Sequence, residues 1–302
     1  MEQDWKTSRK VFAGALGPPL LWLAVFFLAP LAIVWAYSFG QNEGLTQIAL
    51  TGTFGNYARA LEPLYLKILL KSAWIAGLAT LLCLVIGFPV ALAITFASPR
   101  TKTWLLLLVM LPFWTNLLIR TYALIAVLRT EGFLNHGLGA VWKGVGALVS
   151  LTGIGQLPPF VPLELLHNNF AVVTGLVYVH LPFMVLPLYA ALDRLDRSYI
   201  EASLDLGAGH MRTLLRIVAP LAAPGIFSGV LITFIPALGA YLTPDLLGGP
   251  DSQMIANVIE RQFKRANDWP FGAALSFMLM YVTFLAVAGQ AMWARRRAGG
   301  QP

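Results

Sequence analysis

Long apolar runs, separated by shorter polar segments, dominate this chain. A helix of about 20 apolar residues crosses the hydrocarbon layer of a membrane, and six runs reach that length. We therefore expect spans at about 14–39, 69–97, 104–128, 170–192, 221–243 and 271–293. The pattern predicts an all-α integral membrane protein with one membrane domain, 14–293, between the terminal segments 1–13 and 294–302.

Two stretches outside the regular pattern carry expectations of their own. The connection 129–169 includes the irregular run GQLPPFVP, whose backbone groups would lack partners in lipid, and its partly apolar part, 138–151, predicts a short interfacial helix. The first apolar run is longer than the roughly 7–15 residues of a signal-peptide core, which favours an uncleaved anchor. The small residues of Ala36-Tyr37-Ser38 keep cleavage open as an alternative.

Composition excludes several classes of protein. Of 302 residues, 58% are hydrophobic and 12% are charged, whereas soluble domains carry about 25% charged residues. The single cysteine, Cys83, lies inside an apolar run and predicts a packed or lipid-facing side chain, with no disulfide and no thiolate metal site. The four histidines show no metal-ligand spacing, and no basic face is interleaved with aromatics, so the net charge of +7 does not indicate nucleic acid.

The placement of the basic residues predicts the orientation in the membrane. If the N-terminus is cytoplasmic, that side holds more basic than acidic residues, whereas the opposite side holds equal numbers of both. Short cytoplasmic connections are enriched in Lys and Arg. We therefore expect both termini, and also the charged segment 193–220, to be cytoplasmic.

Segment 193–220 reads as a bent pair of short amphipathic helices. The first is expected from Asp193 to about Leu206, with Ile200 and Leu204 on one face, and Gly207 offers the left-handed conformation in which many helices end. The second is expected over 210–219, where one apolar stripe consists of Met211, Leu215 and Val218. Such a pair is either a linker lying on lipid headgroups or a docking surface for a cytoplasmic partner.

Polar and helix-breaking residues mark two places within the spans. Arg120 follows Trp114 in the third run; it either faces a pathway, pairs with an acid such as Asp245, or extends to the outer interface. In the fifth run a proline and a glycine precede a tyrosine and an aspartate, which indicates either a gate or an ordinary kinked helix end. The tentative pathway or gate residues are Trp114, Arg120, Pro236, Gly239, Tyr241 and Asp245.

The segment also carries a motif. Its spacing resembles the signature loop of permease subunits in bacterial ATP-binding-cassette importers, which is Glu-Ala-Ala, three residues, Gly, nine residues and Ile-x-Leu-Pro. Ser203 stands where Ala is usual, and Ala219 stands where Leu is usual. The resemblance implies that the ATPase is contacted by Glu201, Ala202, Ser203, Gly207, Ile217 and Pro220.

Four longer blocks resemble the spermidine/putrescine-type branch of these permeases, and specifically the first of its two paired permease subunits. They lie at 111–123, 181–203, 234–250 and 268–277, and the resemblance covers about 68–293. It implies the type I importer permease fold, with six spans and a cytoplasmic coupling helix pair between spans 4 and 5. It also implies a location in the bacterial inner membrane with both termini cytoplasmic.

The same resemblance implies partners and a cargo. The partners would be a second homologous permease, two ATPase subunits, an extracytoplasmic substrate-binding protein and membrane lipid, and the cargo would be a polyamine. No Gly-x-x-x-x-Gly-Lys-Ser/Thr phosphate loop occurs here, so ATP and Mg²⁺ would be bound by the partner ATPases, and this chain would have no cofactor, metal or catalytic residue. Two alternatives stay open: another small solute in the same importer class, or a secondary transporter, which would need acidic sites within the spans.

Overall fold

The computed structural model describes residues 9–43, 47–151 and 157–298. These residues are mostly helical, and their one sheet is the antiparallel hairpin of β1 (Gln41–Glu43) and β2 (Gln47–Ala49), in which Asn42 lies opposite Ile48. By their contacts the residues form two compact units: Met1–Leu66 with Val258–Pro302, and Lys67–Asn257.

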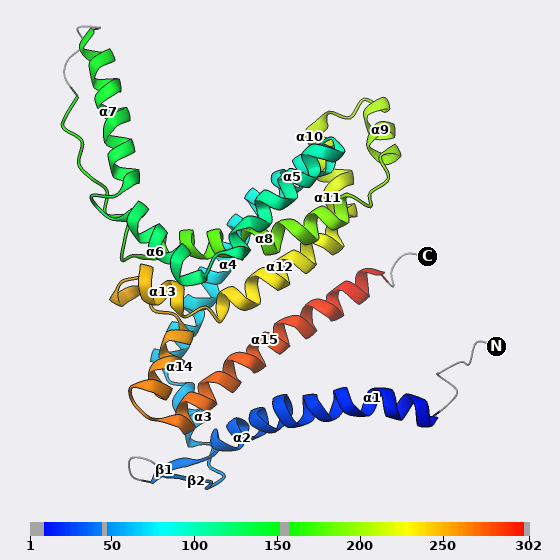
Figure 1. Cartoon of the computed structure of the whole chain (residues 1–302), viewed down its shortest axis with the longest axis vertical. Helices are drawn as coiled ribbons and strands as arrows, with labels where there is room; N and C mark the ends of the chain where they lie inside the picture. Colours follow the sequence, from blue (N-terminus) through cyan, green and yellow to red (C-terminus); the bar gives the residue numbers. More distant parts are fainter. Residues whose placement is uncertain (1–8, 44–46, 152–156, 299–302) are drawn as a thin grey trace. The chain divides into compact units, whose positions relative to one another are not determined.

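The first unit pairs the N-terminal helix with the C-terminal one. The N-terminal helix runs through α1 (Arg9–Leu23), the π-helical turn η1 (Ala24–Leu28) and α2 (Ala29–Tyr37). Helix α15 (Trp269–Ala298) packs against α2 and against α3 (Gly55–Ala60) (Figure 1). At its start, Asp268 accepts a hydrogen bond from Arg59 at 2.8 Å, and the Arg59 guanidinium lies 3.9 Å from the centre of the Phe271 ring. This cluster joins α3 to α15.

The second unit contains most of the remaining helices. Helix α4 enters it from the first unit, and α14 leaves it toward the first unit. The elements in chain order are α4 (Pro63–Phe96), α5 (Pro99–Met110), η2 (Leu111–Trp114), α6 (Leu117–Leu128), α7 (Phe133–Leu151), α8 (Asn169–Leu192), α9 (Ser198–Asp205), α10 (His210–Thr213), η3 (Leu214–Val218), α11 (Ala219–Leu221), α12 (Ala223–Leu238), α13 (Leu242–Leu247), η4 (Pro250–Ser252) and α14 (Ile255–Lys264).

Helices α8 and α12 lie side by side and form the centre of this unit (Figure 1). Gly225 packs against Pro187, and Gly229 packs against Met184, so the two helices run in opposite directions. A Cβ at Gly229 would lie 2.8 Å from the Met184 sulfur, and one at Gly225 would overlap the Ala191 side chain. Small residues four apart let helix backbones approach closely in membranes, and this pair holds the core together.

Adding one methyl group at Gly225 tests this packing. We expect Gly225→Ala to lower the free energy of unfolding by about 1–3 kcal/mol, because the new methyl group overlaps the rigid backbone and Ala191 of α8. Gly77→Ala in α4 is the matched control, since a Cβ there meets nothing within 4 Å. Denaturant or thermal unfolding in detergent measures both. Equal stability of the two variants would contradict the close packing.

Four helices in the described residues are long and apolar enough to cross a membrane, and up to six if each of two bent pairs is counted as one span. The four are Phe12–Tyr37, Pro63–Phe96, Asn169–Leu192 and Trp269–Gly289. They correspond to the first, second, fourth and sixth expected runs. The expected third and fifth spans are the two that differ.

The third run, 104–128, is not one continuous helix. The 3-10 turn η2 ends at Trp114, Thr115 is extended, and the Asn116 side chain accepts a hydrogen bond from the Leu118 amide at 2.8 Å. An asparagine in this position starts a new helix. The pair of helices Pro99–Trp114 and Leu117–Ser150 is therefore bent by 97°. The expected interfacial helix at 138–151 is also longer, because α7 begins at Phe133.

The fifth run, 221–243, is shorter than expected. Helix α12 ends at Leu238, and the helical residues His210–Leu221 and Ala223–Leu238 meet at 70°. Pro236 lies inside the last turn of α12, which ends two residues later, and because it has no N–H the helical hydrogen bond to the Ile232 carbonyl is missing. Residues 239–243 therefore belong to the turn and to α13.

Candidate functional site

Segment 193–220 begins with a turn and not with a helix. Helix α8 ends at Leu192 and α9 begins only at Ser198, so the expected helix from Asp193 starts five residues late. The Asp196 carboxylate accepts a hydrogen bond from the Ser198 amide at 3.0 Å, within the turn that precedes α9. Hydrogen bonds from the backbone and side chain of Ser198 lower the pKa of Asp196. The acidic residue therefore stabilises the turn that leads into α9.

Gly207 ends α9 as its sequence position predicts. Its φ is +80°, in the left-handed region that suits glycine. The Gly207 amide donates to the Leu204 carbonyl at 2.8 Å, and the Ala208 amide donates to the Ser203 carbonyl at 3.1 Å. These two bonds are the Schellman arrangement that closes a helix end. They set the angle at which the chain turns into α10.

The second helix of the segment runs through α10, the π-helical turn η3 and α11. The hydroxyls of Ser203 and Thr213 lie 2.9 Å apart and tie this helix to α9. The expected stripe of Met211, Leu215 and Val218 is wrong at its last member: Val218 is buried, whereas the other two are exposed. A π-helical turn holds more residues than an α-turn, so Val218 rotates away from the stripe and into the core.

The outer surface of this helix pair carries large exposed side chains. Leu206, at the tip, is 89% exposed, and Met211 and Leu215 are exposed beside it. Glu201 and Ala202 are also exposed, and the described residues provide no hydrogen bond or ion pair to the Glu201 carboxylate. Figure 1 shows α9 and α10 beyond the ends of α8 and α12. Apolar and charged groups thus lie together on a projecting surface.

The inner side of the pair rests against the end of α4. Ile200 and Leu204 of α9 line an apolar groove of about 480 Å³ together with Phe96 of α4. The Arg197 guanidinium lies 5.6 Å from the centre of the Phe96 ring. Of the remaining residues of the motif, Ser203 and Ile217 are partly buried, and Pro220 is exposed. The motif residues therefore divide between the outer surface and the base of the pair.

An ion pair fixes the base of segment 193–220 to a neighbouring helix. The Lys102 ammonium, in the first turn of α5, lies 2.6 Å from the Asp193 carboxylate. This hydrogen bond is the main reason why the pKa of Asp193 is lowered and that of Lys102 is raised. This pair could not be expected from the sequence, because 91 positions separate its members and no periodicity relates them.

Acidification tests the Lys102–Asp193 pair. Because the pKa of Asp193 is lowered in the folded chain, its stabilising effect is complete above the ordinary value of about 3.9 and is lost as the pH falls through the lowered value. We expect Asp193→Asn to unfold at a lower temperature than the parent at neutral pH, and the difference to shrink below about pH 4. Thermal unfolding in detergent measures this. A difference that does not change with pH would contradict the pairing.

Arg120 lies in the first turn of α6, directly after the bend. It is partly buried, its Nε atom is buried without a hydrogen-bond partner, and no ion pair joins it to Asp245 in the described residues. Trp114, at the bend itself, is 78% exposed. Arg120 and Trp114 thus lie close to the bend between η2 and α6.

The other pathway candidates lie at the end of α12. Gly239 follows the last helical residue with φ −87°, a conformation open to any residue. The Tyr241 carbonyl accepts hydrogen bonds from the Asn257 side chain at 2.8 Å and from the Asp245 amide at 3.0 Å. Asp245 is exposed in the first turn of α13, and α13 packs against α6 and α8. Helix α13, which carries Asp245, therefore contacts α6, which carries Arg120.

Comparison with known proteins identifies this arrangement of helices. The family of binding-protein-dependent transport system inner membrane components matches residues 84–299. The chain belongs to this family. Its members are membrane transport components, and the four to six spanning helices make this one a multi-pass inner-membrane protein.

Individual members of the family extend the similarity. The spermidine/putrescine transport system permease protein PotB of Salmonella typhimurium (strain SL1344) is 41% identical over 86% of this chain and 86% of its own. PotB of Escherichia coli (strain K12) is 40% identical over 86% of this chain and 90% of its own. A chain of a bacterial alginate ABC transporter, solved with an alginate pentasaccharide-bound periplasmic protein, matches with a TM-score of 0.65, 15% identity and 98% coverage of each chain. The importer permease fold is therefore confirmed.

Proposed function

We propose that this inner-membrane component is one of two transmembrane subunits of an ATP-driven importer of polyamines such as putrescine and spermidine. It pairs with a second, homologous permease as the first of the two, and receives its cargo from an extracytoplasmic binding protein. Two separate ATPase subunits bind ATP and Mg²⁺. Both termini and segment 193–220 face the cytoplasm, in keeping with the excess of basic residues on that side.

The observation that carries the proposal is the projecting helix pair of segment 193–220. Its exposed Leu206 and Met211 suit an apolar groove on a partner, in the manner of a helix bound in a groove. The exposed Glu201 suits a basic residue at the edge of that groove. Because Gly207 and the Ser203–Thr213 hydrogen bond hold the two helices rigidly, movement of the ATPases is passed to α8 and α12.

The cargo is argued from the relatives and from charge. Both relatives reported above are spermidine/putrescine permeases by name, and the exposed carboxylate of Asp245 and the ring of Tyr241 at the end of α12 would attract an amine by charge and by cation–π interaction. Arg120 would repel a polycation, so its role is to position the helices at the bend. The described spanning helices contain no Asp or Glu, which argues against a secondary transporter driven by ions.

Uptake by cells tests the proposal. Cells that lack this chain are expected to lose uptake of labelled putrescine and spermidine, to regain it when the chain is restored beside its native partners, and to lose it again when ATP is depleted. If the complex assembles and hydrolyses ATP but neither polyamine enters, the chain is still a subunit of an importer, and the cargo is another small solute. Uptake that persists after ATP depletion would contradict the importer itself.

A further inference from the structure

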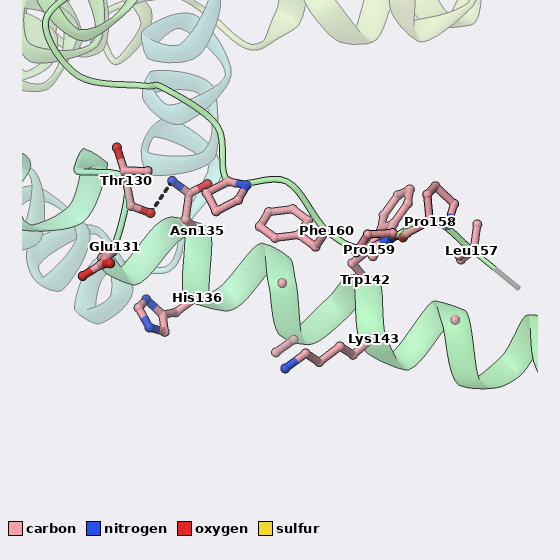
Figure 2. Close-up of a pocket in the computed structure, with 14 residues that line it drawn as sticks. Thr130, Glu131, Asn135, His136, Trp142, Lys143, Leu157, Pro158, Pro159 and Phe160 are labelled. Carbon is pink, nitrogen blue, oxygen red and sulfur yellow. Dashed lines mark hydrogen bonds between the residues drawn. The ribbon is translucent and has the colours of Figure 1, made fainter.

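The helix α7 and the chain that follows it form a hairpin with three distinct sides. The strap, residues 157–163, runs back along one side of α7 (Figure 2). The Trp142 indole donates to the Pro158 carbonyl at 2.9 Å. The Asn135 side chain donates a hydrogen bond through Nδ2 to the Leu163 carbonyl at 2.9 Å, and its Oδ1 accepts one from the Leu163 backbone N–H at 3.0 Å. The strap is therefore fixed to α7 at both of its ends.

The strap is suited to a place with little water. Three of its seven residues are prolines, which have no N–H group. Irregular backbone next to lipid requires that its polar groups find partners within the protein, and Asn135 and Trp142 provide them at the two ends. Phe160 packs on Gly139, where a Cβ would lie 3.3 Å from its ring. A compact, apolar hairpin results.

A second side of α7 is a continuous apolar stripe that the described residues leave uncovered. Its members recur three and four positions apart, as on one face of a helix, and they are 37–66% exposed. They are Leu134, Leu138, Val141, Val145 and Leu148.

A polar line occupies the opposite side of the helix. His136, Lys143 and Ser150 are exposed and recur every seven positions. Since an α-helix turns by about 100° per residue, this line lies about 180° from the centre of the apolar stripe. A groove of about 720 Å³ between α7 and the strap opens on the polar side and includes Glu131, His136 and Lys143 in its wall. Figure 2 shows His136 and Lys143 projecting from a different side than the strap.

The direction of α7 indicates what covers the stripe. The helices Leu117–Ser150 are bent by 97° from Pro99–Trp114, and the latter is part of a span. A helix at a right angle to a span runs nearly parallel to the membrane plane. Helix α6, which the short turn 129–132 joins to α7, also exposes apolar side chains, those of Ile119 and Tyr122. Both helices that follow the bend therefore present apolar surface.

We infer that α7 and its strap lie in the lipid interface of the leaflet opposite segment 193–220. The apolar stripe enters the boundary between headgroups and acyl chains, and the polar line with its groove faces water. Amphipathic helices with one apolar and one polar face lie in membranes in this manner. The hairpin then holds the bend at Asn116 at a fixed depth. The inference does not depend on the cargo of the importer.

Spin labels on α7 test the inference in the assembled complex. Cys83 is replaced by alanine, and single cysteines are introduced by V141C, V145C and L148C on the stripe and by K143C and S150C on the polar line. The labelled complexes are reconstituted in vesicles of phosphatidylethanolamine and phosphatidylglycerol. Collisions with oxygen, which concentrates in lipid, and with a water-soluble nickel chelate are then measured by electron paramagnetic resonance.

The expected result is a reversal between the two sides. Labels at 141, 145 and 148 should collide severalfold more with oxygen than with the chelate, and labels at 143 and 150 should do the opposite. Three stripe positions keep the test decisive if one variant does not assemble. Stripe labels that are immobile and shielded from both reagents would place a protein partner there, and stripe labels that collide mainly with the chelate would place them in water; either result overturns the inference.

Discussion

Replacing Gly207 with valine is expected to reduce ATP-driven uptake by at least about tenfold while the protein still inserts into the membrane. Gly207 has φ +80°, and the left-handed conformation costs an L-residue about 1–2 kcal/mol, and more for a β-branched one. About 1.4 kcal/mol corresponds to a tenfold change in an equilibrium. The Schellman bonds that Gly207 makes possible would be lost, so α9 and α10 would no longer keep their angle.

Gly52→Val is the matched control for this experiment. Gly52 also has a positive φ, +68°, and a side chain there meets nothing within 4 Å. Both variants thus carry a strained valine, but only one lies in segment 193–220. We expect uptake to fall for Gly207→Val and to remain near the parent level for Gly52→Val, at equal protein levels. Full uptake by Gly207→Val would show that the bend does not transmit motion.

Reversing the charge of Glu201 is expected to have the second large effect. The Glu201 side chain is exposed and has no ion pair or hydrogen bond in the described residues, so Glu201→Lys should leave the fold intact. If the carboxylate meets a basic residue of the ATPase, reversal brings two like charges together, and close charge pairs across interfaces contribute about 1.5–7 kcal/mol. Uptake should fall by tenfold or more, and substrate-stimulated ATP hydrolysis should fall with it.

Glu62→Lys provides the comparison for this variant. Glu62 is also exposed and lies before the first turn of α4, outside segment 193–220. The same charge change there should leave uptake unaltered. A rescue of Glu201→Lys by an acidic substitution on the ATPase would identify the partner residue. Normal uptake by Glu201→Lys, with the complex formed, would show that Glu201 does not take part in the contact with the ATPase.

The sequence predicted the helices well where apolar runs are uninterrupted. In the run that ends at Leu192, for example, the residues are mostly apolar and form a single helix. The prediction failed where local hydrogen bonds compete with the run. Asn116 caps a new helix inside an apolar stretch, and Asp196 stabilises a turn before α9. Both residues were visible in the sequence, but hydropathy averaged over a window does not distinguish a capping side chain from a polar residue within a span.

The candidate site shows the same division. The left-handed conformation of Gly207 could be predicted from the sequence, because glycine adopts it at little cost. The burial of Val218 did not follow, because a π-helical turn changes the helical period that the stripe assumed. The Lys102–Asp193 pair joins parts of the chain that are 91 positions apart. Only the packing of the helices brings such residues together.

A photocross-link from segment 193–220 tests most directly whether this segment binds a separate ATPase. The amino acid p-benzoylphenylalanine is placed at Ala202, which is exposed on α9, and, as a comparison, at Phe54, which is exposed before α3. Membranes containing the whole complex are irradiated, and the adducts are identified by mass spectrometry. We expect position 202 to cross-link to a separate ATPase polypeptide and position 54 not to do so. Adducts of position 202 with lipid alone would contradict this expectation, because segment 193–220 would then be a membrane-surface linker.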